Sequence, residues 1–207
     1  MKLYYSDVLS PRKACALAKY LNSPVEFIYQ DLGKGEHKTP EALKRNPNGK
    51  VPTLVDGDRI LWEADAIMCE LASRAKSELW PTDPRKQVEV IRWLSWQEQH
   101  FGVAGGTLYF EYIIRPRFNL GPASQPDVER GTNGFRQFGA VLNDHLRGKT
   151  WLLGNDMTLA DFAVAVCLPY AEKAHMPLGE FPEMRRWHDQ LNELDAWRNP
   201  FPVRAAA

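Results

Sequence analysis

The stretch NPNGKVPTLVDGDRILWEADAIMCELA, residues 46 to 72, decides the fold of the first part of this chain. It begins with turn residues and leads through Pro52 into an apolar run; a proline there has no N–H group to give to a neighbouring strand. Asp56 and Gly57 are a tight-turn signal before a second apolar run. Glu63 follows, where apolar residues begin to recur at helical spacing. We therefore predict a loop, a proline that is a candidate for a cis peptide bond, a β-hairpin and a helix with an acidic N-terminus.

Upstream of this stretch, strand and helix signals alternate. Residues 2 to 6 and 25 to 32 are strand candidates. Ser10 and Thr39 are each followed by proline, which is typical of a helix N-cap and first helical position. The order strand, helix, strand, helix, hairpin, helix implies a right-handed crossover between parallel strands, with antiparallel pairing in the hairpin. We predict a small mixed sheet of four strands with helices on both faces.

After residue 78 the pattern changes to helices alone. Residues 79 to 86 contain two prolines and are predicted to be a linker. The chain is therefore expected to form two domains, an α/β domain over residues 1 to 78 and an all-α domain over residues 87 to 207. The helices predicted for the second domain cover residues 87 to 112 (with a break at Gly105-Gly106), 128 to 147, 182 to 194 and 196 to 199, and one more starts at Thr158.

The helix that starts at Thr158 carries a structural signal of its own. Thr158 and Asp161 are spaced as in a capping box, with aspartate in place of the usual Glu or Gln. The residues that follow are nearly all apolar, which is normal for a buried central helix. This segment is therefore predicted to contribute stability rather than chemistry.

Composition excludes several classes of function. The formal net charge of the 207 residues is zero, which argues against broad binding to nucleic acid. The three cysteines lie far apart, so a reducing, cytoplasmic location is expected. The N-terminus has no apolar signal segment and the longest apolar run, residues 159 to 170, is too short to span a bilayer, so no membrane attachment is expected. The five histidines lack metal-ligand spacing, so no metal is expected either.

Ser10 is the first candidate for chemistry. Free N–H groups and the positive end of the helix dipole favour an anion at a helix N-terminus, including a thiolate. A hydroxyl there could donate a hydrogen bond to sulfur and lower a thiol pKa by about one or two units. Serine is also a favoured N-cap for structural reasons alone. Tyr5, at the end of the first strand, is a competing donor, although an aromatic residue there also suits packing beneath the first helix.

Further candidates surround the hairpin. If the bond before Pro52 is cis, Val51 could offer its N–H and C=O to a peptide ligand; a plain turn proline is the alternative. Glu63 could accept an amine from a ligand or only complement the helix dipole. Lys38 and Lys50 could bind a carboxylate, although most lone lysines are solvated surface groups.

The second predicted domain offers apolar surface. Aromatic residues crowd its first helix, and glycines among them could leave room for a hydrophobic ligand, although such aromatics usually pack in a core. The residues predicted for a hydrophobic substrate are Trp96, Phe101, Tyr109 and Tyr112, beside Gly102, Gly105 and Gly106.

Taken together and in order, these motifs resemble the cytosolic glutathione S-transferase superfamily over nearly the whole chain. The motifs that carry the resemblance are Asn-Pro-x-Gly-Lys-Val-Pro at residues 46 to 52, Glu-Ala-x-Ala-Ile at 63 to 67 and Leu-Ala-Asp at 159 to 161. The chain looks most like the serine-type bacterial and theta-like members. The resemblance implies a thioredoxin-like domain followed by an all-helical domain, a homodimer, and glutathione as co-substrate.

The resemblance also implies a role for each candidate in the first domain. Ser10 would hydrogen-bond the glutathione sulfur and hold it as thiolate. Val51 would pair its backbone with the cysteinyl part, with Pro52 in the cis form.

The ends of the tripeptide would bind elsewhere. Glu63 and the N–H group of Ala64 would hold the γ-glutamyl end, and Lys50, with Lys38, would meet the glycyl carboxylate. The family commonly has serine where this chain has Ala64, and the lost hydroxyl would weaken binding by about 1 kcal/mol. The segment after Ser10 also departs from many relatives, which would bring Arg12 close to the sulfur.

The function that the resemblance implies is glutathione transfer to a hydrophobic electrophile, with detoxification as its purpose. Peroxide reduction, dehalogenation, ether cleavage or isomerisation would use the same activated thiol. A second hypothesis is a non-catalytic interaction module of the same fold, as in stringent starvation protein A.

Overall fold

The computed structural model describes residues 1–203, and the chain forms two compact units. The first unit is Met1–Ser77 together with the end of the chain from Leu194, and the second is Glu78–Glu193. The end of the chain therefore differs from the expected domain of residues 87 to 207. The expected linker, residues 79 to 86, also belongs to the second unit, because Leu79 is buried there and its carbonyl accepts a hydrogen bond from the N–H of Leu159 at 3.0 Å.

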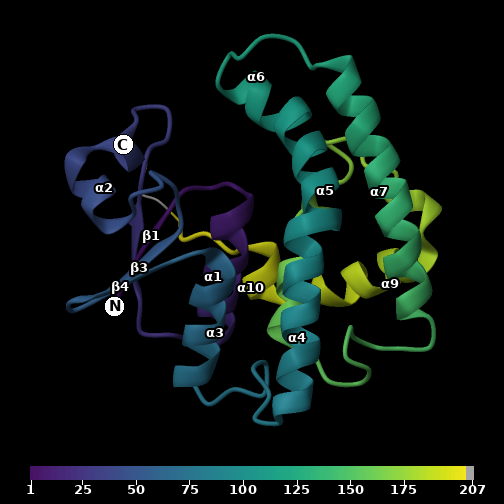
Figure 1. Ribbon diagram of the computed structural model, residues 1–207, viewed down its shortest axis with the longest axis horizontal. Helices are drawn as coiled ribbons and strands as arrows, with labels where there is room; N and C mark the ends of the chain where they lie inside the picture. Colours follow the sequence, from purple (N-terminus) through teal and green to yellow (C-terminus); the bar gives the residue numbers. More distant parts are fainter. Residues whose placement is uncertain (204–207) are drawn as a thin grey trace. The chain divides into compact units, whose positions relative to one another are not determined.

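The first unit is built on a four-stranded mixed sheet in the order β2-β1-β3-β4 (Figure 1). Strand β1 (Lys2–Tyr5) runs parallel to β2 (Glu26–Tyr29) and antiparallel to β3 (Thr53–Asp56), which pairs with β4 (Arg59–Trp62). Gly57 in the hairpin has a φ of 63°, a conformation that favours glycine. The predicted crossover, hairpin and mixed sheet are confirmed.

Helices cover both faces of this sheet, as predicted. Helices α1 (Leu9–Tyr20) and α3 (Ala64–Arg74) pack against each other on one face, and α2 (Pro40–Arg45) lies on the other (Figure 1). Thr39 caps α2 by accepting a hydrogen bond from the N–H of Ala42 at 3.3 Å, which confirms the predicted helix start. A 3₁₀ turn, η1 (Glu36–Lys38), precedes it.

The predicted N-cap of the first helix is wrong. Helix α1 begins at Leu9, because Val8 is the residue with extended backbone (φ −133°, ψ 174°) and its carbonyl accepts from the N–H of Arg12 at 3.1 Å. Pro11 fits inside the first turn, where N–H groups have no helical acceptor and a missing one costs nothing. Ser10 is therefore the second helical residue, and the helix start has no side-chain cap.

The second unit begins with one long helical run. It consists of α4 (Pro84–Trp96), the π-helical turn η2 (Gln97–Phe101), α5 (Gly102–Tyr109), the π-helical turn η3 (Phe110–Ile114) and α6 (Arg115–Arg117). The predicted break at Gly105-Gly106 is wrong, since both glycines lie inside α5. Gly105 instead permits close packing, because a Cβ atom there would lie 2.5 Å from Sγ of Cys167.

The rest of the second unit packs around a short central helix. Helix α8 (Leu159–Val164) is wholly buried and starts with the predicted capping box of Thr158 and Asp161. It ends earlier than the apolar sequence suggests, and is followed by η4 (Leu168–Tyr170), η5 (Leu178–Glu180) and α9 (Pro182–Leu191). Helix α7 (Gln125–Leu146) packs against α5 and α9 and starts three residues before the predicted position.

The last helix returns to the first unit. Helix α10 (Asp195–Arg198) contacts α1, and the fully buried Trp197 accepts a hydrogen bond from the guanidinium group of Arg12 through its backbone carbonyl. The Arg12 guanidinium also lies 5.1 Å from the centroid of the Trp197 ring. The ring of Phe201 stacks on that of Tyr5 at 5.8 Å. Residues 194 to 203 thus belong to the first unit and contribute Trp197 and Phe201 to the packing around α1 and Tyr5.

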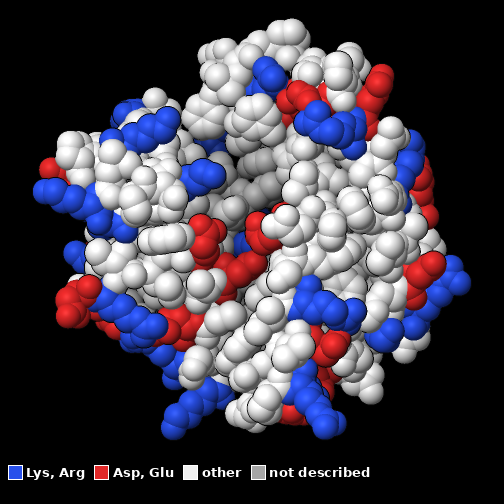
Figure 2. Space-filling model, in the orientation of Figure 1, with Lys and Arg blue, Asp and Glu red and all other residues white. Residues whose placement is uncertain are grey.

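The surface is mixed in charge. Figure 2 shows Lys and Arg side chains interspersed with Asp and Glu side chains, in keeping with a formal net charge of zero. Within residues 1–203, none of the helices combines the length and the apolar character needed to cross a membrane.

Candidate functional site

The register of the sheet gathers the candidate residues of the first unit at one end. Tyr4 of β1 pairs with Thr53 of β3, and Thr53 pairs with Trp62 of β4. Because both pairings are antiparallel, the C-terminal end of β1, the N-terminal end of β3 and the C-terminal end of β4 lie in one row. Ser10 follows the first of these ends, Pro52 precedes the second, and Glu63 follows the third.

An ion pair joins the two helices that leave this row. The ammonium group of Lys13 on α1 lies 2.6 Å from Oδ1 of Asp65 on α3, and the Lys13 side chain is only 2% exposed. The first turns of α1 and α3 are therefore neighbours, so free N–H groups from two helix N-termini face the same end of the sheet.

Ser10 has a hydroxyl group that is accessible at this end of the sheet. The two competing residues, Tyr5 and Arg12, are buried. The Ser10 side chain is exposed in the first turn of α1. The ring of Tyr5 is 2% exposed and packs against Phe27, Tyr29 and Phe201. The guanidinium group of Arg12 contacts the buried residue Trp197, whose backbone carbonyl accepts a hydrogen bond from it. The geometry favours Ser10 as the donor to an anion.

The loop before β3 contains a residue, Val51, whose backbone makes no hydrogen bond within residues 1–203, although the residue is only 8% exposed. The Val51–Pro52 peptide bond is cis, which confirms the prediction for that bond. The side chain of Asn46 fixes this loop by donating to the carbonyl of Lys50 at 2.9 Å and to Oγ1 of Thr53 at 3.3 Å. Among residues 1–203, no group donates to or accepts from the backbone of Val51, so it can pair with an extended ligand.

Glu63 occupies a special backbone position at the start of α3. It is the N-cap residue, with a φ of 72° that non-glycine residues rarely adopt, and its carbonyl accepts from the N–H of Ile67 at 3.0 Å. Its side chain is exposed, whereas Ala64 is buried. A carboxylate and free N–H groups thus lie together, which suits a ligand that carries both an ammonium and a carboxylate.

Lys38 and Lys50 lie on adjacent segments and are both exposed. The turn η1 packs against Gly49, where a Cβ atom would lie 3.7 Å from Cγ of Lys38 and from the carbonyl oxygen of His37. Two ammonium groups can therefore serve one carboxylate beside the cis-proline loop.

His37 is a residue of this region that the sequence analysis missed. Its Nδ1 atom is buried and has no hydrogen-bond partner in the described part of the chain. Burial, and then the charge of Lys38, lower the pKa of the imidazole below its usual value. Its position directly before Lys38, in a turn rich in polar residues, was the available signal.

The four aromatic residues predicted for a hydrophobic substrate differ in their exposure to solvent. Phe101 and Tyr109 are buried in the second unit. The ring of Trp96 stacks on Phe101 at 5.8 Å, and the ring of Tyr112 contacts His175 at 4.6 Å. Trp96 and Tyr112 are partly exposed, so only these two can contact a ligand without repacking of the core.

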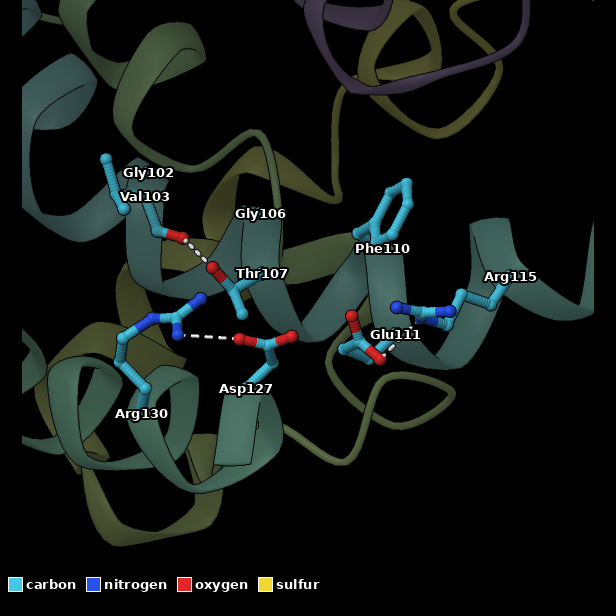
Figure 3. A pocket seen from close by; sticks show the side chains of 9 residues that line it. All are labelled: Gly102, Val103, Gly106, Thr107, Phe110, Glu111, Arg115, Asp127 and Arg130. Carbon is cyan, nitrogen blue, oxygen red and sulfur yellow. Dashed lines mark hydrogen bonds and ion pairs between the residues drawn. The ribbon is translucent and has the colours of Figure 1, made fainter. Parts of the chain in front are cut away.

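A cavity of about 420 Å³ lies elsewhere in the second unit, between α5, η3 and α7 (Figure 3). Its lining residues are Gly102, Val103, Gly106, Thr107, Phe110, Glu111, Arg115, Asp127 and Arg130. Two of the predicted glycines line it, and none of the four predicted aromatics does. Its charged groups are paired with one another, Arg115 with Glu111 at 2.7 Å and Arg130 with Asp127 at 2.6 Å.

No group of three or more His, Cys, Asp or Glu side chains is placed to hold a metal ion within residues 1–203. Burial raises the pKa of the Cys69 thiol to about 11, and that of the Cys167 thiol to about 12. These two thiols are therefore protonated at neutral pH and are poor nucleophiles.

Comparison with known proteins agrees with this architecture. The sequence models for the glutathione S-transferase N-terminal and C-terminal domains match residues 2–72 and 125–190. A probable glutathione S-transferase of Oryza sativa subsp. japonica, GSTF2, is 31% identical over 196 residues, which are 92% of this chain and 91% of that protein. Glutathione S-transferase 3 of Zea mays is 32% identical over 205 residues, with 94% and 90% covered.

Solved structures give the same result. A structure of glutathione S-transferase-I bound with the ligand lactoylglutathione has a TM-score of 0.85 and 26% identity, covering 96% of this chain and 97% of that one. Glutathione transferase F2 from Populus trichocarpa has a TM-score of 0.87 at 24% identity, with 96% of both chains covered, which shows the shared fold. With a thioredoxin-like unit, a helical unit and relatives that match along nearly its full length, this chain belongs to the glutathione S-transferase family.

Proposed function

We propose that this protein is a glutathione transferase that binds glutathione at the row of strand ends and joins its sulfur to a hydrophobic electrophile. The observation that carries the proposal is the sheet register, which brings Ser10, the backbone of Val51 and Glu63 to one end of the first unit. An extended tripeptide with an ammonium group at one end and a carboxylate at each end matches these groups in kind.

Each part of the tripeptide has a partner in this proposal. The cysteinyl backbone pairs with the backbone of Val51, in the segment that leads into β3 and beside the cis bond to Pro52. The γ-glutamyl end meets the Glu63 carboxylate and the N–H of Ala64 at the start of α3. The glycyl carboxylate meets Lys50 and Lys38, with His37 as a neutral imidazole beside them.

The chemistry begins at the first turn of α1. The Ser10 hydroxyl donates a hydrogen bond to the glutathione sulfur, and the helix N-terminus stabilises the negative charge, so the thiol loses its proton to solvent. The thiolate electron pair then attacks an electrophilic carbon, which forms a C–S bond while the leaving group departs with its own electron pair. The electrophile is proposed to contact Trp96 or Tyr112, the two of the four predicted aromatic residues that are partly exposed, with Phe101 and Tyr109 in the core beside them.

Titration with reduced glutathione in a calorimeter tests this proposal most directly. Wild-type protein is expected to bind saturably, and Glu63→Ala to bind roughly 10- to 100-fold more weakly, because a charge-assisted hydrogen bond contributes about 1.5–3 kcal/mol.

The matched control is Glu26→Ala, at an exposed position of β2 that pairs only loosely with Lys2 at 4.0 Å. It removes the same carboxylate from the opposite end of the sheet and should leave the affinity unchanged. Equal affinity of wild type and Glu63→Ala would remove Glu63 from the site. If folded wild-type protein did not bind glutathione at all, the alternative of a non-catalytic interaction module would be favoured. The residue that supports this alternative is Ala64, which lacks the hydroxyl of the serine that the family commonly has there.

We also propose a homodimer, in which a second copy covers apolar side chains that each unit leaves exposed. The residues concerned are Ile60 and Trp62 on the edge strand β4, and Val88, Ile91, Val103 and Val141 in the helical unit, each 40% exposed or more. Exposed apolar side chains gathered on secondary-structure elements are typical of protein interfaces.

Light scattering after size exclusion tests the dimer. Wild type is expected at twice the chain mass of 23.7 kDa. Ile91→Glu should shift the population toward the monomer, since a buried unpaired charge is costly in an interface. Glu89→Ala on the same helix, at an exposed ion pair with Arg92, is the control. A wild-type monomer at micromolar concentration would contradict the proposal.

A cytoplasmic location, a role in detoxification and the bacterial serine-type subclass remain predictions of the sequence. The two relatives compared above by sequence are plant proteins.

A further inference from the structure

Lys13 is the most deeply buried cationic side chain near the row of strand ends. It is 2% exposed, and its ammonium group lies 2.6 Å from Oδ1 of Asp65, whose side chain is 17% exposed. Removing an ammonium group from water is costly unless a partner compensates, and the Asp65 carboxylate is a partner that lowers this cost. An apolar residue would fill the same space without that cost.

The two partners lie beside the two halves of the proposed glutathione site. Lys13 follows Ser10 by three residues, which places the two residues one above the other on α1. Asp65 lies two residues after Glu63, in the first turn of α3. The ion pair therefore joins the turn that would hold the sulfur to the turn that would hold the γ-glutamyl end.

We propose that Lys13 is a positioning residue, which through Asp65 fixes the spacing between the sulfur position and the γ-glutamyl position. This inference rests on the proposed function. The two groups of glutathione are joined covalently, so their separation is limited, and a site for both must hold its two halves at a matching distance. A misplacement of about 1 Å is enough to impair such a site. An ion pair suits this task because its short, directed contact fixes the helices more narrowly than apolar packing does.

The remainder of the first turn of α1 is held from another side. Arg12, the neighbour of Lys13, is bound to Trp197 of α10. The α1 turn is therefore anchored independently of Asp65. Loss of the ion pair is expected to shift α3 relative to α1 rather than to release α1.

Three ligands separate a positioning role of Lys13 from a general loss of structure. Glutathione and γ-glutamylcysteine span both positions, whereas cysteinylglycine lacks the γ-glutamyl group and occupies only the sulfur side. For Lys13→Met, we expect roughly tenfold weaker binding of glutathione and γ-glutamylcysteine by calorimetry, while binding of cysteinylglycine stays unchanged. Lys13→Arg, which keeps the charge, should recover most of the affinity.

Controls make each outcome decisive. Lys2→Met removes an exposed, loosely paired ammonium group from the opposite end of β1 and should bind all three ligands like wild type. Asp65→Asn should reproduce the Lys13→Met result, and the double variant should be no weaker than either single variant, as expected for one shared interaction. If Lys13→Met does not fold, Asp65→Glu, which keeps the charge and lengthens the arm, provides the same comparison.

The results that overturn the inference are distinct from those that overturn the proposed function. If Lys13→Met lost affinity equally for all three ligands, or lost none, the positioning role would be overturned. The proposed function would still stand as long as the wild-type protein binds glutathione. Absence of glutathione binding by wild type would overturn both.

Discussion

Ser10→Ala is expected to lower the turnover of glutathione with an activated aryl halide by roughly 10- to 100-fold, the equivalent of one charge-assisted hydrogen bond of about 1.5–3 kcal/mol. The KM for glutathione should change little, since the contacts proposed at Val51, Glu63 and Lys50 would not involve the hydroxyl. The physical reason is that this bond is made to the thiolate and is weaker to the neutral thiol. Steady-state kinetics gives both numbers.

A second measurement isolates the role of the hydroxyl. The ultraviolet absorbance of bound thiolate, followed against pH, should show the pKa of the bound thiol raised by about one to two units in Ser10→Ala. Ser10→Thr keeps a hydroxyl and should retain much of the activity, and Ser73→Ala, at an exposed position near the end of α3, is the matched control. Tyr5→Phe tests the rival: if it, and not Ser10→Ala, abolished turnover, Tyr5 would be the donor.

The second large effect is expected in the helical unit, where Asp161→Ala should lower the free energy of unfolding by about 3–5 kcal/mol. The Asp161 side chain is fully buried. Its carboxylate accepts hydrogen bonds from the N–H groups of Leu152 at 3.0 Å and Thr158 at 2.8 Å, and from Nε1 of Trp187 at 2.9 Å. Truncation leaves these donors without an acceptor and opens a cavity. Urea unfolding followed by tryptophan fluorescence measures the change.

Asp156 provides the control in the same unit. Its ion pair with Lys86 at 3.2 Å is exposed on both sides, so Asp156→Ala should leave the unfolding midpoint unchanged. If Asp161→Ala changed the unfolding midpoint as little as Asp156→Ala, the structural role of Asp161 would be contradicted.

The burial of Asp161 should also make the free energy of unfolding depend on pH. Burial raises the pKa of Asp161 to about 6, and its hydrogen bonds offset part of that rise. Because the folded state holds this proton more tightly than the unfolded state, the stability contributed by Asp161 is complete below about pH 4 and falls as the pH rises through 6. In Asp161→Asn this part of the pH dependence should be absent. A wild-type and Asn variant with parallel stability curves from pH 4 to 7 would contradict it.

The sequence alone determined most of the first unit. Turn chemistry at Gly57, the cis-proline loop and the helix starts at Thr39 and Glu63 depend on residues close together in the chain, so local patterns predict them. The capping box at Thr158 was predictable for the same reason. Ser10, Pro52 and Glu63 follow or precede strands that these local signals predicted, and the sheet register brings those strand ends together.

Other features were decided only by tertiary structure. The burial of Arg12 depends on Trp197, 185 residues further along the chain, and the ion pair of Lys13 depends on the packing of α1 on α3. Gly105 lies inside α5, where it leaves room for Cys167, and no pattern within the helix reveals that contact. The end of the chain joins the first unit for the same physical reason: a buried tryptophan is stabilised by whichever surface can cover it, and the sequence does not state which surface that is.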